Sequence, residues 1–174
     1  MLGSVGLKAL PGPYNGLATK IQYIRDCYRD ALLGHPEVRA YAEAIAGAAP
    51  KLNQIKAMFE ALKKAYFYAG DPEGFVFNKE TVGVELMKAP WEMVNAIRSS
   101  GHSSGDCDDQ ATLNYTLLKI MGIPAVVRVV WYSGSMPGHI YLLAALNEDT
   151  WVPFDTTSPS LGYERPYLHA EDFA

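Results

Sequence analysis

The feature that most constrains this chain is a helix that is apolar almost all the way round. In the segment SSGDCDDQATLNYTLLKIMGIPA, residues 103–125, the spacing of apolar residues predicts a helix from Cys107 to Met121. Gly122 suits the end of this helix, and Pro124 prevents it from continuing. A helix without a polar face belongs in the centre of a domain, because each of its sides needs an apolar neighbour. We therefore expect the rest of the chain to be built around it.

Helical patterns come before this central helix and strand patterns come after it. We expect helices at about 17–33, 36–46 and 51–68, with a short helix after Pro90. We expect an irregular arm at 1–15, a segment at 75–90 that wanders over the surface, and a loop at HSSGD, residues 102–106. β-branched and apolar runs predict antiparallel strands at 125–132, 139–146 and 151–155. This order predicts an α+β fold. We expect one domain over 1–174, mainly helical over 1–100 and with its catalytic core at 101–174.

The composition fits a folded domain and gives no sign of nucleic-acid binding. The chain has 174 residues, 49% hydrophobic and 20% charged, which is enough for a sizeable core. Its net charge is −4, and its 15 lysines and arginines form no basic run that would bind phosphates. No apolar stretch approaches the roughly 18 residues of a membrane span, and the first residues lack a signal-peptide pattern. Two cysteines, Cys27 and Cys107, are too few for a disulfide scaffold, so we expect free thiols in the cytoplasm.

Cys107 has three readings: a nucleophile, a metal ligand or a small core residue. At the start of a helix, the partial positive charge of the free amides favours the thiolate. Asp106, Asp108 and Asp109 oppose its ionisation, and we expect them to bind the free amides of the first helical turn. A calcium loop lacks its ligand spacing here, and a zinc site lacks a paired Cys or His motif, so we expect no metal and no cofactor. Cys27, at core spacing on a helix, is expected to be inert.

A base for Cys107 has to come from elsewhere in the chain, and His139 fits best. Of the four histidines, His139 alone follows a Gly-rich loop and opens an apolar strand. If 139–146 and 151–154 pair as a hairpin, Asp155 at the end of one strand lies beside His139 at the start of the other. A third group of this kind can hold the tautomer of a histidine base and stabilise its cation. The alternatives are a structural strand histidine and an aspartate that only caps a turn.

Three motifs in this order resemble the transglutaminase-like domain, a branch of the papain-like cysteine enzymes. They are GDCDDQATLNYTLLKIMGIPA, GHIYLLA and WVPFDTT, and together they cover about residues 103–158. The resemblance implies that Cys107 is the nucleophile, His139 the base and Asp155 the orienting acid, on a central helix packed against an antiparallel sheet. Upstream, VGVELMKAPWEMV is similar to the version of this domain found in bacteriophage and prophage proteins.

Three further residues, Trp91, Ser104 and Trp151, are candidates for the same site. No oxyanion donor can be assigned in the first hundred residues, and the candidates are Trp91, Ser104 and the amide of Cys107 itself. Trp151 is expected in the core, where it could also cover His139.

Two classes of function follow from these observations. The first is a cysteine acyl-transfer enzyme that attacks an amide of a peptide or protein and forms a thioester. Water would then make it a protease or amidase and an amine a transglutaminase, and the small size favours hydrolysis. The second is a non-catalytic structural or assembly module, associated with a virion if the chain derives from a phage. The sequence predicts neither a nucleic-acid nor a membrane partner, and it leaves the oligomeric state open.

Overall fold

The computed structural model of the protein describes residues 8–10, 16–70, 76–77, 80–81, 85–134 and 137–174. Its helices are α1 (Gly16–Gly34), α2 (Pro36–Ala46), α3 (Lys51–Ala65), α4 (Pro90–Ser100) and α5 (Cys107–Ile120). Its shorter strands are β1 (Lys8–Leu10), β2 (Tyr66–Tyr68), β3 (Val76–Phe77), β4 (Glu80–Thr81), β5 (Glu85–Met87) and β6 (Ser103–Gly105). The main sheet contains β7 (Ala125–Trp131), β8 (His139–Ala145), β9 (Trp151–Phe154) and β10 (His169–Phe173).

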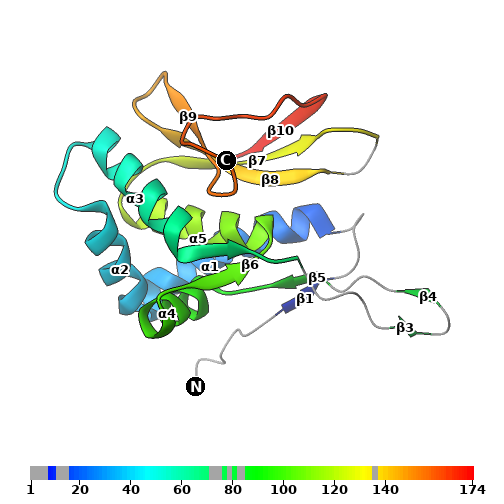
Figure 1. Ribbon diagram of the computed structural model, residues 1–174, viewed down its shortest axis with the longest axis horizontal. Helices are drawn as coiled ribbons and strands as arrows, with labels where there is room; N and C mark the ends of the chain where they lie inside the picture. Colours follow the sequence, from blue (N-terminus) through cyan, green and yellow to red (C-terminus); the bar gives the residue numbers. More distant parts are fainter. Residues whose placement is uncertain (1–7, 11–15, 71–75, 78–79, 82–84, 135–136) are drawn as a thin grey trace.

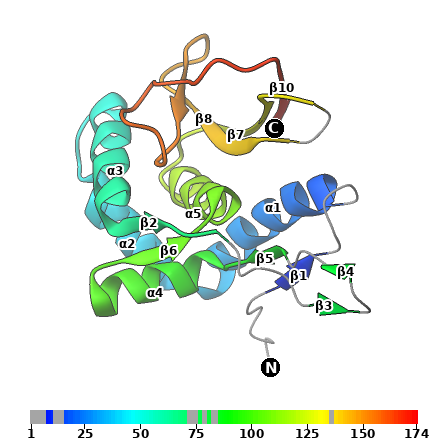
Figure 2. The same ribbon diagram turned by 45° about the vertical axis from the view of Figure 1, so that its right-hand side comes forward.

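The main sheet is antiparallel, with the strand order β10-β7-β8-β9. It covers one side of α5, and Figures 1 and 2 show α4 and β6 on the other side of that helix. The inward face of the sheet and α5 share one core, in which Leu117, Leu118, Leu142 and Phe154 are fully buried. The mixed arrangement of helices and an antiparallel sheet confirms the expected α+β fold with a papain-like, transglutaminase-like core.

Most of the predicted elements are confirmed, and α5 is central as expected. Eleven of its residues are buried, and these include polar ones such as Gln110 and Asn114. Gly122 follows the helix with φ 69°, a left-handed conformation that glycine adopts at little cost. The hairpin of β8 and β9 forms with Leu142 opposite Phe154 and Ala145 opposite Trp151.

Several predictions about the shorter segments were wrong. Tyr66–Tyr68 is a strand rather than the last turn of the third helix, and it pairs in parallel with β6, in the segment expected to be a loop. Lys8–Leu10, expected to be irregular, pairs with β5, and Met87 at the end of the expected surface segment is fully buried. The strand β10 was not predicted at all. Each of these strands is short and depends on a partner distant in sequence, so its own residues carry little periodic signal.

Within the described residues, no helix has the length and apolar character needed to cross a membrane. That residues 1–174 form a single domain stays a prediction.

Candidate active site

Cys107 is the first residue of α5 and follows the residue that caps the helix. The carboxylate of Asp106 accepts hydrogen bonds from the backbone N–H groups of Asp108 and Asp109, at 3.2 and 3.4 Å. This confirms the capping role expected for one of the three acids. Among the described residues, the backbone N–H of Cys107 has no acceptor, so this donor beside the thiol is not used by the protein itself.

The two other acids are buried rather than capping. Asp108 forms a salt bridge of 2.6 Å with Lys20 of α1, and Asp109 accepts the backbone N–H of Lys88 at 2.6 Å. Both carboxylates are 1% exposed, so an ammonium or amide partner is needed to offset the cost of their burial. A Cβ atom at Gly105 would collide with the carboxylate of Asp109 and the hydroxyl of Tyr66, which explains why glycine precedes this turn.

These surroundings make Cys107 a thiol and not a preformed thiolate. Burial, followed by the negative charges of Asp106 and Asp108, raises the pKa of Cys107 to about 12. The backbone N–H of Ile140, which faces the sulfur, and the charge of Lys20 lower it only in part. Asp106 and Asp108 therefore oppose the ionisation of Cys107, as expected from the sequence, and burial adds to their effect.

His139 and Asp155 lie side by side and share a hydrogen bond, as expected from the predicted hairpin. Nε2 of His139 lies 2.8 Å from Oδ2 of Asp155, and both residues are largely buried. Asp155 also accepts hydrogen bonds from Thr157 and Ser158, the two residues that end the loop 155–158. Burial by itself would raise the pKa of Asp155, but the hydrogen bonds from His139, Thr157 and Ser158 bring it below its usual value. Asp155 is therefore held as an anion beside the ring.

A buried polar bridge ties this loop to the helix that carries Cys107. The hydroxyl of Thr156 donates to Oε1 of Gln110 at 2.6 Å and accepts from Nδ2 of Asn114 at 3.0 Å. All three side chains are less than 8% exposed. Lys63 of α3 also donates to the carbonyl of Ser158. This bridge was not predicted from the sequence. Two side-chain amides four residues apart in an otherwise apolar helix are the signal that could have revealed it.

The backbone of β8 brings Cys107 and His139 to the same place. The N–H group that faces the sulfur belongs to Ile140, the residue directly after His139. Because Nε2 is taken by Asp155, Nδ1 is the ring nitrogen left for a proton from Cys107, and Nδ1 has no partner in the described part of the chain. No direct hydrogen bond between the sulfur and the imidazole is present among those residues.

The three accessory residues make contacts of their own in the structure. The Trp91 indole stacks on His35 with ring centroids 3.9 Å apart, at the junction of α1 and α2. Ser104 forms part of β6, where its carbonyl accepts a hydrogen bond from Lys88. Trp151 lies opposite Ala145, six residues along β8 from His139 and roughly 20 Å away at the rise of a strand. It is 40% exposed, so the prediction that it lies in the core and could cover His139 was wrong.

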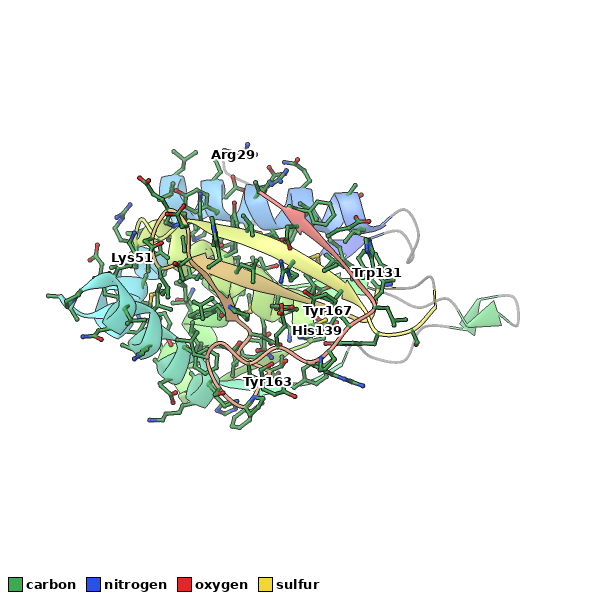
Figure 3. All side chains as sticks on the ribbon, turned by 90° about the horizontal axis from the view of Figure 1, so that it is seen from above. Arg29, Lys51, Trp131, His139, Tyr163 and Tyr167 are labelled. Carbon is green, nitrogen blue, oxygen red and sulfur yellow. The ribbon has the colours of Figure 1, made fainter. Side chains whose placement is uncertain are left out.

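A pocket of about 340 Å³ opens beside His139 and Asp155. We call it the tyrosine pocket, because its walls include Tyr68, Tyr132 and Tyr163 as well as Arg165. Figure 3 shows Tyr163 on the segment after β9, which passes beside His139. No period or motif in the sequence assigns these residues to the site, since they come from β2 and from segments after β7 and β9.

The three acids at the start of α5 lie close enough together to be considered as a metal site. Asp106, Asp108 and Asp109 each have a carboxylate oxygen within 4.8 Å of the others. Asp106 is used as the helix cap, and the ammonium of Lys20 lies against Asp108. A cation would compete with these contacts, so we assign no metal to the cluster.

Comparison with known proteins identifies the family. The model of the transglutaminase-like superfamily matches residues 39–156, more than half of the chain, and the match includes Cys107, His139 and Asp155. The chain belongs to the transglutaminase-like superfamily. No curated protein sequence matches it.

One solved structure, from Cytophaga hutchinsonii, is described as a "Putative Cysteine Protease". It superimposes with a TM-score of 0.49 at 14% sequence identity and covers 92% of this chain. This chain spans only 50% of that protein's length.

Proposed function

We propose that this transglutaminase-like domain is a cysteine-dependent acyl-transfer enzyme that acts on amides of peptides or proteins. The single observation that carries the proposal is the hydrogen bond between His139 and Asp155, at the strand end whose backbone faces the sulfur of Cys107. A histidine held by a carboxylate through one ring nitrogen keeps the other available as a base.

The chemistry starts from the neutral thiol. Nδ1 of His139 accepts the thiol proton as the sulfur of Cys107 attacks the amide carbonyl, and a C–S bond forms. The imidazolium then gives this proton to the leaving amine as the C–N bond breaks, which leaves a thioester on Cys107. Water or a second amine attacks the thioester, the C–S bond breaks, and the thiol is regenerated.

The raised pKa of Cys107 decides the role of His139 in this scheme. A thiol with a pKa of about 12 provides almost no thiolate at neutral pH. The proton therefore has to move during the attack itself, and Asp155 stabilises the imidazolium that results. The sulfur and Nδ1 have to approach each other for this step, which substrate binding would favour.

The free backbone N–H of Cys107 is the best supported oxyanion donor. It lies next to the attacking sulfur, and the Asp106 cap uses the N–H groups of the two following residues instead. A donor aimed at the developing oxyanion contributes without any side chain from the first hundred residues.

A non-catalytic role is the second candidate, and the high pKa of Cys107 together with the lack of a sulfur–imidazole hydrogen bond favours it. A structural or assembly module, including a phage-derived one, would need no reactive thiol. The same experiment separates it from the enzyme.

The experiment is incubation of the protein with a defined peptide mixture, followed by mass spectrometry, with and without added methylamine. We expect peptide cleavage or deamidation in water, or methylamine adducts if an amine is the preferred acceptor. Cys107→Ala should lower the product yield by about three orders of magnitude, as for loss of a catalytic nucleophile, whereas Cys27→Ala should not. No product in any arm, or equal product from Cys107→Ala, would favour the non-catalytic role.

A further inference from the structure

Arg165 stands out among the residues of the tyrosine pocket because its guanidinium has no carboxylate partner in the described part of the chain. Its guanidinium lies over the ring of Tyr132, with 4.4 Å between Cζ and the ring centroid. No hydrogen bond or salt bridge joins it to another side chain in the described residues. By contrast, Arg128 of β7 forms salt bridges with both Glu164 and Asp172.

The pocket's own carboxylate cannot serve as the missing partner. Oδ1 of Asp155 accepts two hydrogen bonds from Thr157, and Oδ2 accepts from Ser158 and contacts Nε2 of His139. Glu164, the neighbour of Arg165 in sequence, is held on the sheet by Arg128 at 2.9 Å and by the hydroxyl of Tyr141. Both nearby acids are therefore engaged with other groups, and the guanidinium of Arg165 keeps its donors without a side-chain acceptor among the described residues.

The surrounding contacts hold Arg165 in position. The side chain of the preceding residue, Glu164, is bound by Arg128, and the contact with the face of Tyr132 restricts the side chain of Arg165 itself. A planar guanidinium presents its donors in a fixed fork, which matches the two oxygens of a carboxylate. These donors have no side-chain acceptor among the described residues, so the arrangement is suited to binding an anion and not only to filling space.

The lining of the pocket also includes aromatic side chains that are open to solvent. Tyr68 is 63% exposed and Tyr163 45% exposed, although both line the pocket with His139. Exposed tyrosines of this kind offer apolar contact area to a ligand at little entropic cost. They would also exclude water from a carboxylate at Arg165, which strengthens the ion pair.

We propose that the tyrosine pocket selects amide substrates with a carboxylate near the reacting amide, and that Arg165 binds this carboxylate. The inference rests on the proposed function, because it assigns the pocket beside His139 to the substrate. The carboxylate belongs either to an acidic side chain or to a free C-terminus, and the two share the same chemistry at Arg165. Arg165 is thus a specificity residue and takes no part in proton transfer.

The test measures peptide binding to Cys107→Ala, so that it does not depend on turnover. The probes are hexapeptides in matched pairs, with Glu or Gln at each scanned position and with a free or amidated C-terminus. We expect one acid peptide to bind roughly 10- to 100-fold more tightly than its amide, the range of a charge-assisted hydrogen-bond pair. Adding Arg165→Gln should remove this preference while binding of the amide peptide changes little, and Arg165→Lys should restore it in part.

The matched control is Arg39→Gln in the same background, since Arg39 is an exposed arginine of α2 paired with Glu43. It should keep the acid preference. Equal binding of acid and amide peptides, or a preference that survives Arg165→Gln, would overturn the inference. Because these arms measure only binding, a failure here leaves the chemical role of Cys107 to the product assay, and a failure of that assay leaves the binding preference intact.

Discussion

Asp155 is the residue on which the histidine depends most. Its two oxygens accept hydrogen bonds from Thr157 and Ser158 and contact Nε2 of His139. The sequence pointed to this residue through its place at the end of a predicted hairpin, and the hydrogen bond to His139 follows from that hairpin. Its catalytic role stays a prediction, as do those of Cys107 and His139.

Asp155→Asn tests the orienting role. The side-chain amide of the variant has no charge to stabilise an imidazolium, and its NH₂ group can hold His139 in the wrong tautomer. We therefore expect turnover to fall by two to four orders of magnitude. Circular dichroism should show an unchanged fold. Asp172→Asn, which removes an exposed partner of Arg128, is the control and should leave turnover within about twofold. Near-normal turnover in Asp155→Asn would show that Asp155 only shapes its loop.

The lowered pKa of Asp155 also gives a prediction about acid stability. A carboxylate whose pKa is lower in the folded than in the unfolded protein stabilises the fold above the unfolded value of about 3.9. This contribution is lost as the pH falls through the folded value. Urea denaturation should therefore show that the native protein loses more stability between pH 5 and pH 3 than Asp155→Asn does. Parallel curves for the two proteins would contradict the shift.

Among the elements, the contact between the loop 155–158 and α5 places Asp155 relative to Cys107. Thr156 satisfies the amides of Gln110 and Asn114, all of them buried. Thr156→Val leaves both amides with an unpaired group, and we expect the free energy of unfolding to fall by about 1–3 kcal/mol. Chemical denaturation measures this loss, and Thr156→Ser should avoid most of it.

Thr116 is a matched control on the same helix. Its side chain is fully buried, and its hydroxyl has no hydrogen-bond partner in the part of the chain that the structure describes. Thr116→Val exchanges that hydroxyl for a methyl group of similar shape, so the free energy of unfolding should stay the same or rise. Similar losses in Thr116→Val and Thr156→Val would mean that the bridge contributes no more than packing does.

The helices and strands show which parts of the fold could be predicted from the sequence. The buried helix α5 and the strands β7, β8 and β9 were predicted because each has a strong pattern of its own. The parallel pair of Tyr66–Tyr68 with Ser103–Gly105 was missed, since neither three-residue segment has a period and each needs the other. The same limit applies to the site. Cys107, His139 and Asp155 open or follow patterned elements, whereas Arg165 and Thr156 gain their partners only through the fold.

For the whole molecule, the fold places a buried thiol next to a more open pocket. The thiol of Cys107 lies beside Asp106 and Asp108, while the neighbouring pocket carries exposed tyrosines and the guanidinium of Arg165. In the proposed mechanism, these surroundings keep Cys107 protonated until His139 accepts its proton. The proposed substrate carboxylate would meet a local cation in this pocket, although the net charge of the protein is −4.

The most direct test of this account is the pH profile of Cys107 alkylation in the native protein and in His139→Ala. Iodoacetamide labelling, resolved by mass spectrometry, separates Cys107 from Cys27, which is 2% exposed and should stay unlabelled in both proteins. The burial and the two aspartates that raise the pKa of Cys107 to about 12 remain in His139→Ala, so its thiol should react about tenfold faster per pH unit from pH 6 to pH 9. The native protein should react at least about tenfold faster at pH 7 and depend less steeply on pH, because His139 accepts the proton. Superimposed profiles would contradict a catalytic pair of Cys107 and His139.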